Sequence, residues 1–271
     1  MSAQQVSWIT GASSGIGAAL AVELASRGHA LILSARNRES LEEVQRHCMR
    51  VGLDESRITV LPLDVTDSAA IEAVTSEAIN CYGHIDLLVN NAGISQRSLC
   101  LDTEMATYRQ LFEVDVFGQI AVTKALLPHM VERKKGHIAV TASVAGKIGV
   151  PLRTGYCAAK HAMMGFFDAL RAEVSVYDVK VSTIVPGFIN TNLSQNALKG
   201  DGSKFAVTDD DIANGMSADS AAKVIADGLS SAQKEINVGE GKEMIGLKIK
   251  RFFPSLIFKM MNKRMRENTI K

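Results

Sequence analysis

Short apolar runs alternate along this chain with stretches in which apolar residues recur every three or four positions. Val6–Thr10 is the first run, and Ile16, Leu20 and Leu24 follow it at helical spacing as far as Gly28. The same alternation continues along most of the chain. It predicts further strands at Ala30–Ser34, Ile58–Leu61, Asp86–Asn90, His137–Thr141 and Lys180–Val185, and further helices at Glu39–Val51, Ala69–Tyr82, Met105–Val131 and Gly155–Tyr177.

Strands that are separated by helices long enough to serve as crossovers indicate a parallel sheet, because right-handed crossovers pack back onto a twisted sheet. We therefore predict a single-domain α/β Rossmann fold, with a doubly wound parallel sheet of about seven strands flanked by helices. This domain is expected over residues 1–240, followed by a basic, amphipathic C-terminal extension over residues 241–271. From Asn192 to Met216 the residues are small, polar and acidic without periodicity, which predicts a mobile loop.

Composition and charge narrow the classes of protein that fit. The formal net charge of +1 argues against a nonspecific nucleic-acid-binding protein, and 46% hydrophobic residues can supply a large core. The four cysteines are far apart and form no CxxC pair, so they are read as reduced thiols. No zinc-like ligand spacing, export signal or membrane-spanning run is visible, and we therefore expect no metal and a cytoplasmic location.

The C-terminal extension is the exception to the balanced charge. Lys242–Lys271 holds nine Lys or Arg residues against Glu243 and Glu267, so its net charge is 9 − 2 = +7. Apolar residues from Leu247 to Met261 are interleaved with these basic residues. Such a helix can lie on an anionic membrane surface, or its apolar side chains can cap a pocket or close a dimer. We favour packing and keep peripheral membrane contact as the alternative.

The first strand runs into a glycine-rich turn, Thr10–Gly17, that opens the first helix. Its three glycines permit a tight turn and a close approach to a pyrophosphate, and the free N–H groups of the helix attract phosphates. Three glycines at a helix start can equally be ordinary turn chemistry, but their position in a βαβ unit favours a nucleotide. The predicted contacts are Gly11, Ser13, Ser14, Gly15, Ile16 and Gly17.

The end of the second predicted strand indicates which dinucleotide binds. An acidic residue there would bind the ribose 2′-hydroxyl, but the segment Leu33–Arg38 has none and offers Arg36, with Arg38 nearby. Arginine binds a 2′-phosphate bidentately, which favours NADP over NAD, although both arginines could merely be solvated. Asp64, followed by Val65, could accept from the adenine amine or could cap the next helix.

Tyr156 and Lys160 are four residues apart in a predicted helix, which places both on one face. A nearby ammonium lowers the pKa of a phenol and suits it to acid/base catalysis. Ser143 follows the fifth predicted strand, at the sheet edge where ligands bind in open α/β folds, and its hydroxyl could hold a substrate oxygen. A tyrosine and a lysine at this spacing are often only surface partners, and Ser143 could simply be a capping residue.

From Val6 to about Val238 the chain resembles the short-chain dehydrogenase/reductase family. The resemblance is carried by the turn Thr10–Gly17, by the NNAG segment Asn90–Gly93, by Ser143, Tyr156 and Lys160, and by Pro186–Gly187. It implies that Tyr156 is the general acid/base, that Lys160 lowers the pKa of Tyr156 and holds the nicotinamide ribose, and that Ser143 orients the substrate carbonyl. It also implies a homodimer or homotetramer. The further cofactor contacts that it implies are Asn91, Ala92, Gly93, Pro186, Gly187, Ile189 and Thr191.

Asp115 is a departure from this family pattern, which usually has Asn at that position. The resemblance implies that the residue helps to hold a water in a proton relay from Lys160, largely through its backbone carbonyl, so the relay could survive. A buried carboxylate near Lys160 could instead form a salt bridge and alter the pH dependence.

The segment Leu126–Glu173 is most similar to the branch of the family that contains DHRS-type and 11β-hydroxysteroid-dehydrogenase-like enzymes, which often act on lipophilic carbonyls. We therefore expect an NADP(H)-dependent oxidoreductase that acts on a carbonyl or secondary alcohol, with the loop Asn192–Met216 covering the substrate. The alternatives are a 3-oxoacyl-carrier-protein reductase, and a nonenzymatic NADP-binding sensor or scaffold. The intact set Ser143, Tyr156 and Lys160 argues against a sensor, because simple binding needs no proton chemistry.

Overall fold

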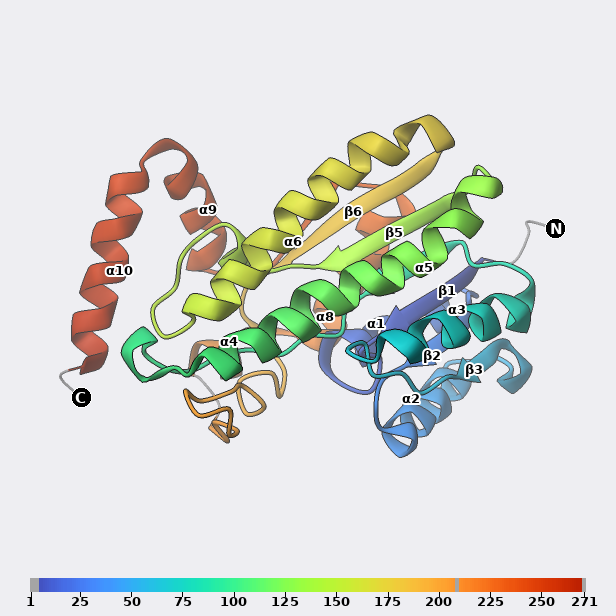
Figure 1. The fold of residues 1–271 in the computed structure, drawn as a ribbon, viewed down its shortest axis with the longest axis horizontal. Helices are drawn as coiled ribbons and strands as arrows, with labels where there is room; N and C mark the ends of the chain where they lie inside the picture. The colour runs from blue at the N-terminus through green and yellow to red at the C-terminus, as the bar shows by residue number, and fades with distance from the viewer. Residues whose placement is uncertain (1–4, 208–209, 270–271) are drawn as a thin grey trace.

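The computed structural model describes residues 5–207 and 210–269 and confirms the predicted fold class. Seven parallel strands form one sheet in the order β3-β2-β1-β4-β5-β6-β9 (Figure 1). The chain thus builds outward from β1 in both directions, which creates a crevice between β1 and β4 at the carboxyl ends of the strands. The strands are β1 Val6–Thr10, β2 Ala30–Ser34, β3 Ile58–Val60, β4 Leu87–Asn90, β5 Gly136–Thr141, β6 Val179–Pro186 and β9 Glu235–Val238.

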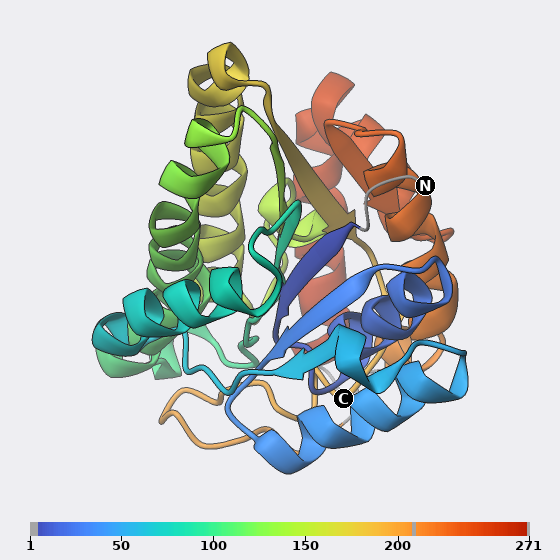
Figure 2. The same ribbon diagram turned by 90° about the vertical axis from the view of Figure 1, so that its right-hand side faces the viewer.

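Helices cover both faces of the sheet, as Figure 2 shows along the layers. One face packs against α1 Gly15–Ser26, α2 Arg38–Arg50 and α8 Ala218–Ser230. The other packs against α3 Ser68–Tyr82, α5 Gly118–Glu132 and α6 Thr154–Glu173. Successive side chains of a strand point to opposite faces of the sheet. Ile9 therefore packs on the α1 side and Trp8 on the α6 side, and both are fully buried.

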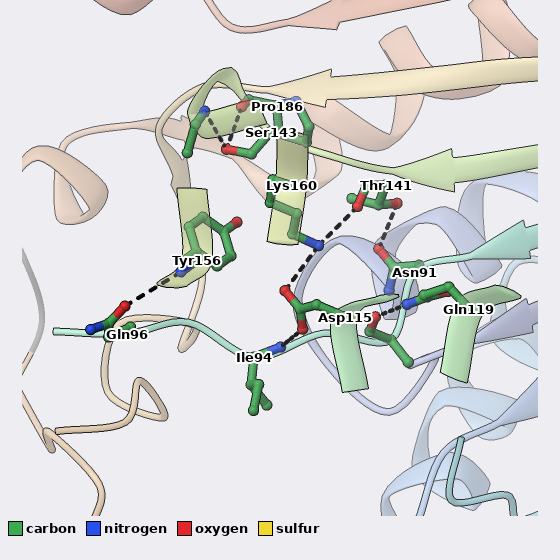
Figure 3. A network of polar contacts seen from close by, with 12 residues as sticks. Asn91, Ile94, Gln96, Asp115, Gln119, Thr141, Ser143, Tyr156, Lys160 and Pro186 are labelled. Carbon is green, nitrogen blue, oxygen red and sulfur yellow. Dashed lines mark hydrogen bonds and ion pairs between the residues drawn. The ribbon is translucent and has the colours of Figure 1, made fainter. Parts of the chain in front are cut away.

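The long helix predicted at Met105–Val131 is not one regular helix, and this prediction was wrong in detail. The chain forms α4 Met105–Phe112, then a π-helical turn Glu113–Phe117, and then α5. A π turn inserts one extra residue into the helical path and rotates the side chains that follow. This turn contains Asp115, whose fully buried side chain points toward Lys160 of α6 (Figure 3).

Among its described residues, the segment Asn192–Met216 contains the short helix α7 Asp210–Ala213 and the start of β8 Met216–Ser217. β8 pairs in parallel with β7 Ile189–Asn190, which lies just before this segment. The seventh strand of the sheet, β9, pairs with β6 and had not been located from the pattern. Its four residues alternate exposed and buried, which is too short a signal to distinguish from a turn.

The C-terminal extension forms two helices, α9 Lys242–Phe252 and α10 Pro254–Thr269. Pro254 begins α10 and cannot continue α9, because proline lacks an N–H and suits the first position of a helix. Ile257 on α10 is buried against Ile148, Met164 and Val185. Figure 1 shows both helices at the end of the molecule toward which the strand arrows point. No helix in the described ranges is long and apolar enough to cross a membrane.

Candidate active site

A cleft of about 1120 Å³ lies at the carboxyl ends of the strands. It brings together residues from the loops after β1, β2, β3, β4, β5 and β6 with the start of α6 and parts of α9 and α10. Every residue predicted to contact the cofactor lines it except Gly17, and so does Ser143. The lining residues among them are Gly11, Ser13, Ser14, Gly15, Ile16, Arg36, Asp64, Val65, Asn91, Ala92, Gly93, Tyr156, Lys160, Pro186, Gly187, Ile189 and Thr191.

Gly17 is buried, and its role is in packing. A Cβ at Gly17 would lie 2.3 Å from the Gly11 carbonyl oxygen and 2.5 Å from the Asn91 amide nitrogen, so only glycine fits. Gly11 has φ +64°, and a Cβ there would lie 2.7 Å from the Ala92 Cα. The two glycines therefore let the β1–α1 turn lie directly against the loop after β4.

The amino end of α1 opens on the cleft with the features of a phosphate site. The N-cap residue Ser14 makes no side-chain capping bond, and the first turn carries no acidic residue. The N–H groups of the first helical turn are then available to an anion, and the helix dipole favours negative charge there. The chemistry of this cradle fits the pyrophosphate of a dinucleotide.

Asn91 ties this turn to the middle of the sheet. Its amide nitrogen donates to the carbonyl oxygens of Thr10 at 3.3 Å and Gly11 at 3.2 Å, and its amide oxygen accepts from the Thr141 hydroxyl at 3.1 Å (Figure 3). The resemblance implied that Asn91 contacts the cofactor. In the structure both the nitrogen and the oxygen of this amide bind protein groups, so Asn91 holds the turn after β1 against the end of β5.

The structure separates the two arginines that follow β2. Arg36 is exposed and lines the cleft, whereas Arg38 lies in the first turn of α2 and pairs with Glu42 at 3.7 Å on the surface. Arg36 is therefore the one of the two that can reach a 2′-phosphate. Asp64 also lines the cleft, and its carboxylate accepts from the Thr66 backbone N–H at 2.9 Å. The next helix is capped by Asp67, which accepts from the N–H groups of Ala69 and Ala70.

Tyr156 and Lys160 extend from adjacent turns of α6 on the same face, as the sequence spacing predicted (Figure 3). The Lys160 Nζ lies 5.6 Å from the centre of the Tyr156 ring. Both side chains are buried, and both line the cleft. Ser143 lies just after β5 beside them, where its hydroxyl accepts from the Ala145 backbone N–H at 3.1 Å. Ser143 thus caps a short turn and also faces the cleft.

Lys160 is held from two sides. Its ammonium donates to the Thr141 carbonyl oxygen at 3.1 Å and forms an ion pair with the Asp115 Oδ2 at 3.2 Å. The Asp115 Oδ1 accepts from the Ile94 backbone N–H at 2.7 Å. The salt bridge that the sequence suggested is therefore present. An ammonium has three donors, and these two contacts leave one for a ligand in the cleft.

The pKa of Tyr156 differs from the sequence prediction, which expected Lys160 to lower it. Burial raises the pKa of the Tyr156 phenol, and although Lys160 opposes this, Asp115 adds to it, so the net pKa is raised. Burial also raises the pKa of Asp115 more than Lys160 lowers it. Burial by itself lowers the pKa of Lys160, but Asp115 and Tyr156 outweigh it and raise the net value. Lys160 thus lowers the pKa of Tyr156, as predicted, but burial and Asp115 together outweigh it.

The other half of the cleft comes from the loop between β5 and α6, from the segment after β7 and from the C-terminal helices. Ile148 and Val150 line it on one side, and Ile257, Met260 and Met261 of α10 line it on another. Arg264 of α10 forms an ion pair with Asp211 of α7. The extension therefore forms part of the pocket wall, while Phe252, Phe253 and Leu256 at the α9–α10 junction remain 69%, 66% and 48% exposed.

Sequence reasoning missed several residues that hold the site. Gln96 accepts from the N–H groups of Gly155 and Tyr156, Gln119 donates to the Ala92 carbonyl oxygen, and Thr141 holds both Asn91 and Lys160. All of them act across the fold on residues far away in the sequence. The one available signal was that Gln96 and Thr141 lie at or shortly after the ends of strands, at the edge where ligands bind.

The chain matches the family described as short chain dehydrogenase over residues 5–202. It is similar to the human protein "Dehydrogenase/reductase SDR family member 7", with 42% identity over 260 residues, which cover 95% of this chain and 77% of the relative.

Solved structures show the same fold. A short-chain dehydrogenase/reductase from Burkholderia phymatum in complex with NAD has a TM-score of 0.81 and 22% identity, covering 93% of this chain and 95% of that one, which bears on the fold alone. A metagenomic short-chain oxidoreductase in complex with NADP has a TM-score of 0.70 and 30% identity, covering 86% of this chain and 96% of that one.

Proposed function

The chain belongs to the short-chain dehydrogenase/reductase family, and on that premise we propose that it is an NADP(H)-dependent oxidoreductase that acts on a lipophilic carbonyl or secondary alcohol. One observation carries this proposal. Ser143, Tyr156 and Lys160 line the same cleft as the glycine turn at α1, so proton-transfer groups and a dinucleotide cradle share one space. A site for binding alone needs no such group.

When bound, the nicotinamide would supply the hydride, and this chain's own residues would hold and transfer the proton. The Tyr156 hydroxyl donates its proton to the substrate oxygen during reduction, and the Ser143 hydroxyl donates a hydrogen bond to the same oxygen. A raised pKa keeps Tyr156 protonated at neutral pH, which suits reduction. Lys160 stabilises the tyrosinate that remains, and its position is set by Thr141 and Asp115.

Arg36 supports NADP as the preferred cofactor. It lines the cleft at the end of β2, where no acidic side chain is present to bind a ribose 2′-hydroxyl. Arg36→Ala should weaken NADPH binding and leave NADH binding almost unchanged. Arg38→Ala is the matched control, because Arg38 pairs with Glu42 outside the cleft lining. Equal NADPH/NADH ratios in the wild type and Arg36→Ala would remove this assignment.

Apolar side chains support a lipophilic substrate. Ile148, Val150, Ile257 and Met261 line the same cleft as Tyr156. Purified protein should oxidise NADPH with bulky ketones or aldehydes in preference to small polar ones. Faster turnover of acyl thioesters would favour the 3-oxoacyl-carrier-protein reductase. Nucleotide binding without turnover across the panel would favour a sensor.

Tyr156→Phe is the direct test of the chemistry. It keeps the ring and removes the proton, so turnover should fall on the order of 10²–10⁴-fold while NADPH binding persists. Turnover at the wild-type level would exclude Tyr156 as the acid.

We further propose that the α9–α10 junction contacts an anionic lipid surface. Phe252, Phe253 and Leu256 are exposed there and are flanked by Arg251 and Lys259. Phe252→Ser/Phe253→Ser should lose co-sedimentation with vesicles that contain phosphatidylserine and keep NADPH binding. No sedimentation of the wild type would refute the contact.

We also propose a homodimer or homotetramer. Met105 and Phe117, near the ends of the α4 and π-turn segment, are 60% and 54% exposed and offer apolar surface to a second copy of the chain. A monomeric mass in solution by light scattering would exclude this assembly.

A further inference from the structure

The catalytic helix α6 begins without a capping side chain of its own. Its N-cap residue, Arg153, makes no side-chain capping bond. The missing acceptor comes from Gln96, whose Oε1 accepts from the Gly155 N–H at 2.7 Å and, more weakly, from the Tyr156 N–H at 3.4 Å (Figure 3). These are the second and third residues of the helix, the N–H groups that an N-cap side chain ordinarily satisfies.

The orientation of the Gln96 amide is determined by its other contacts. Its Nε2 donates to the Ser98 hydroxyl at 3.0 Å and to the Thr103 hydroxyl at 3.1 Å. Thr103 in turn donates to the Leu99 carbonyl oxygen at 2.6 Å, so Ser98 is the donor in its 2.7 Å contact with Thr103. Each hydrogen in the group has an acceptor, and the amide oxygen must therefore face α6.

The start of α6 is shaped to accept this side chain. Gln96 is fully buried. A Cβ at Gly155 would lie 2.5 Å from the Tyr108 ring and 3.0 Å from the Gln96 Oε1. Any larger residue at position 155 would push the helix away from its cap, so Gly155 and Gln96 are complementary.

The backbone around Gln96 is also held in place. Leu198 donates to the Ser95 carbonyl oxygen at 2.8 Å, and Arg97 donates to the Leu198 carbonyl oxygen at 2.8 Å. Two residues before Gln96, Ile94 holds the Asp115 carboxylate. One short segment therefore supports both the partner of Lys160 and the turn of helix that carries Tyr156.

We propose that Gln96 is a positioning residue, which caps α6 from the loop after β4 and so sets the place of Tyr156 in the cleft. The inference rests on the proposed function for its consequence in turnover, but the cap itself can be measured without a substrate. A shift of about 1 Å at a reacting group can cost on the order of 10²-fold in rate, so a single cap can be decisive here.

The experiment compares three variants. Gln96→Met keeps a similar length and removes the acceptor, and Gln96→Glu restores an acceptor oxygen. Asp67→Ala is the matched control, because Asp67 also accepts from two N–H groups at the start of a helix, α3, and does not line the cleft. The readouts are kcat and KM, the dissociation constant of NADPH, the melting temperature, and amide hydrogen exchange.

Gln96→Met should lower kcat about tenfold or more with NADPH binding within about twofold of the wild type. Asp67→Ala should lose comparable thermal stability and keep its kcat. Gln96→Glu should recover part of the kcat, and its added negative charge should move the loss of reduction at high pH toward higher pH, because it disfavours the tyrosinate. An unchanged kcat in Gln96→Met, or an equal loss in Asp67→Ala, would overturn the inference.

Hydrogen exchange separates this inference from the proposed function. Gln96→Met should speed exchange of the Gly155 and Tyr156 amides and leave the rest of α6 protected. If the wild type turns over no substrate, the proposed function fails, and faster exchange at these amides still supports the cap. Unchanged exchange there overturns the cap whatever the turnover.

Discussion

Asp86 and Asp115 are two buried aspartates at opposite ends of the sheet. Asp86 lies just before β4 and is 5% exposed, and its carboxylate contacts Arg133 and Lys135, both at 3.0 Å, and the Val6 N–H at 3.2 Å. Asp115 lies at the carboxyl end, is fully buried, and contacts Lys160 and the Ile94 N–H. The residue type is the same, but the number of compensating charges differs.

That difference decides the protonation behaviour of the two ends. Burial raises the pKa of Asp86, but its hydrogen bonds from Arg133 and Lys135 outweigh burial and lower the net pKa. At Asp115 the single cation, Lys160, does not outweigh burial, and the net pKa is raised. The Asp86 carboxylate at the amino end of the sheet is therefore stabilised in its charged form. At the carboxyl end Asp115, Lys160 and Tyr156 lie close enough to shift one another's pKa.

Asp115→Ala should give the largest effect. It would leave the Lys160 ammonium buried and unpaired, so the free energy of unfolding should fall by about 3–5 kcal/mol, and turnover should fall with it. Urea denaturation and steady-state kinetics measure both. A stability loss smaller than that of Asp86→Ala would contradict the comparison.

Asp86→Ala should cost less, about 2–3 kcal/mol, although the Asp86 carboxylate has more charged partners than the Asp115 carboxylate. Arg133 and Lys135 have side chains that are 24% and 61% exposed, so water can solvate them once the carboxylate is gone. Turnover per folded molecule should be unchanged. A fall in kcat at a temperature where the variant is folded would show that the two ends are coupled.

The acid dependence of stability should have opposite signs at the two sites. A lowered folded pKa means that Asp86 contributes stability above its unfolded value of 3.8, which is lost as the pH falls through the lower folded pKa. The raised folded pKa of Asp115 works in reverse, and stability is lost as the pH rises through it. Asp86→Asn should therefore flatten the acid loss of stability measured by denaturation at several pH values, and Asp115→Asn should not.

Asp115→Asn should cost less stability than Asp115→Ala, because the amide keeps the volume of the side chain and its one oxygen can still accept from Ile94 or from Lys160, whereas the carboxylate serves each of them with a separate oxygen. Its effect should appear in the pH profile. Asp115 raises the pKa of Tyr156, so its neutralisation should move the loss of reduction at high pH toward lower pH. An unchanged profile would mean that the carboxylate does not act on Tyr156.

The parts of the site that the sequence predicted are those whose requirements are local. The turn Thr10–Gly17 follows from glycine backbone freedom beside a strand, and the shared face of Tyr156 and Lys160 follows from helical spacing. The pairing of Asp115 with Lys160 was foreseeable as one of two outcomes. The Gln96 cap was not, because its amide serves N–H groups 59 and 60 residues away along the chain.

By itself the sequence determined the fold class, the cradle at α1 and the identity of the candidate acid, since short-range periodicity and backbone limits are properties of neighbouring residues. The tertiary structure decided which polar groups are buried together. Only the tertiary structure shows that burial raises the pKa of Tyr156 more than Lys160 lowers it. It also shows that Ile257 of α10 lines the cleft. Desolvation and packing depend on groups distant in the chain, and only the folded arrangement brings them together.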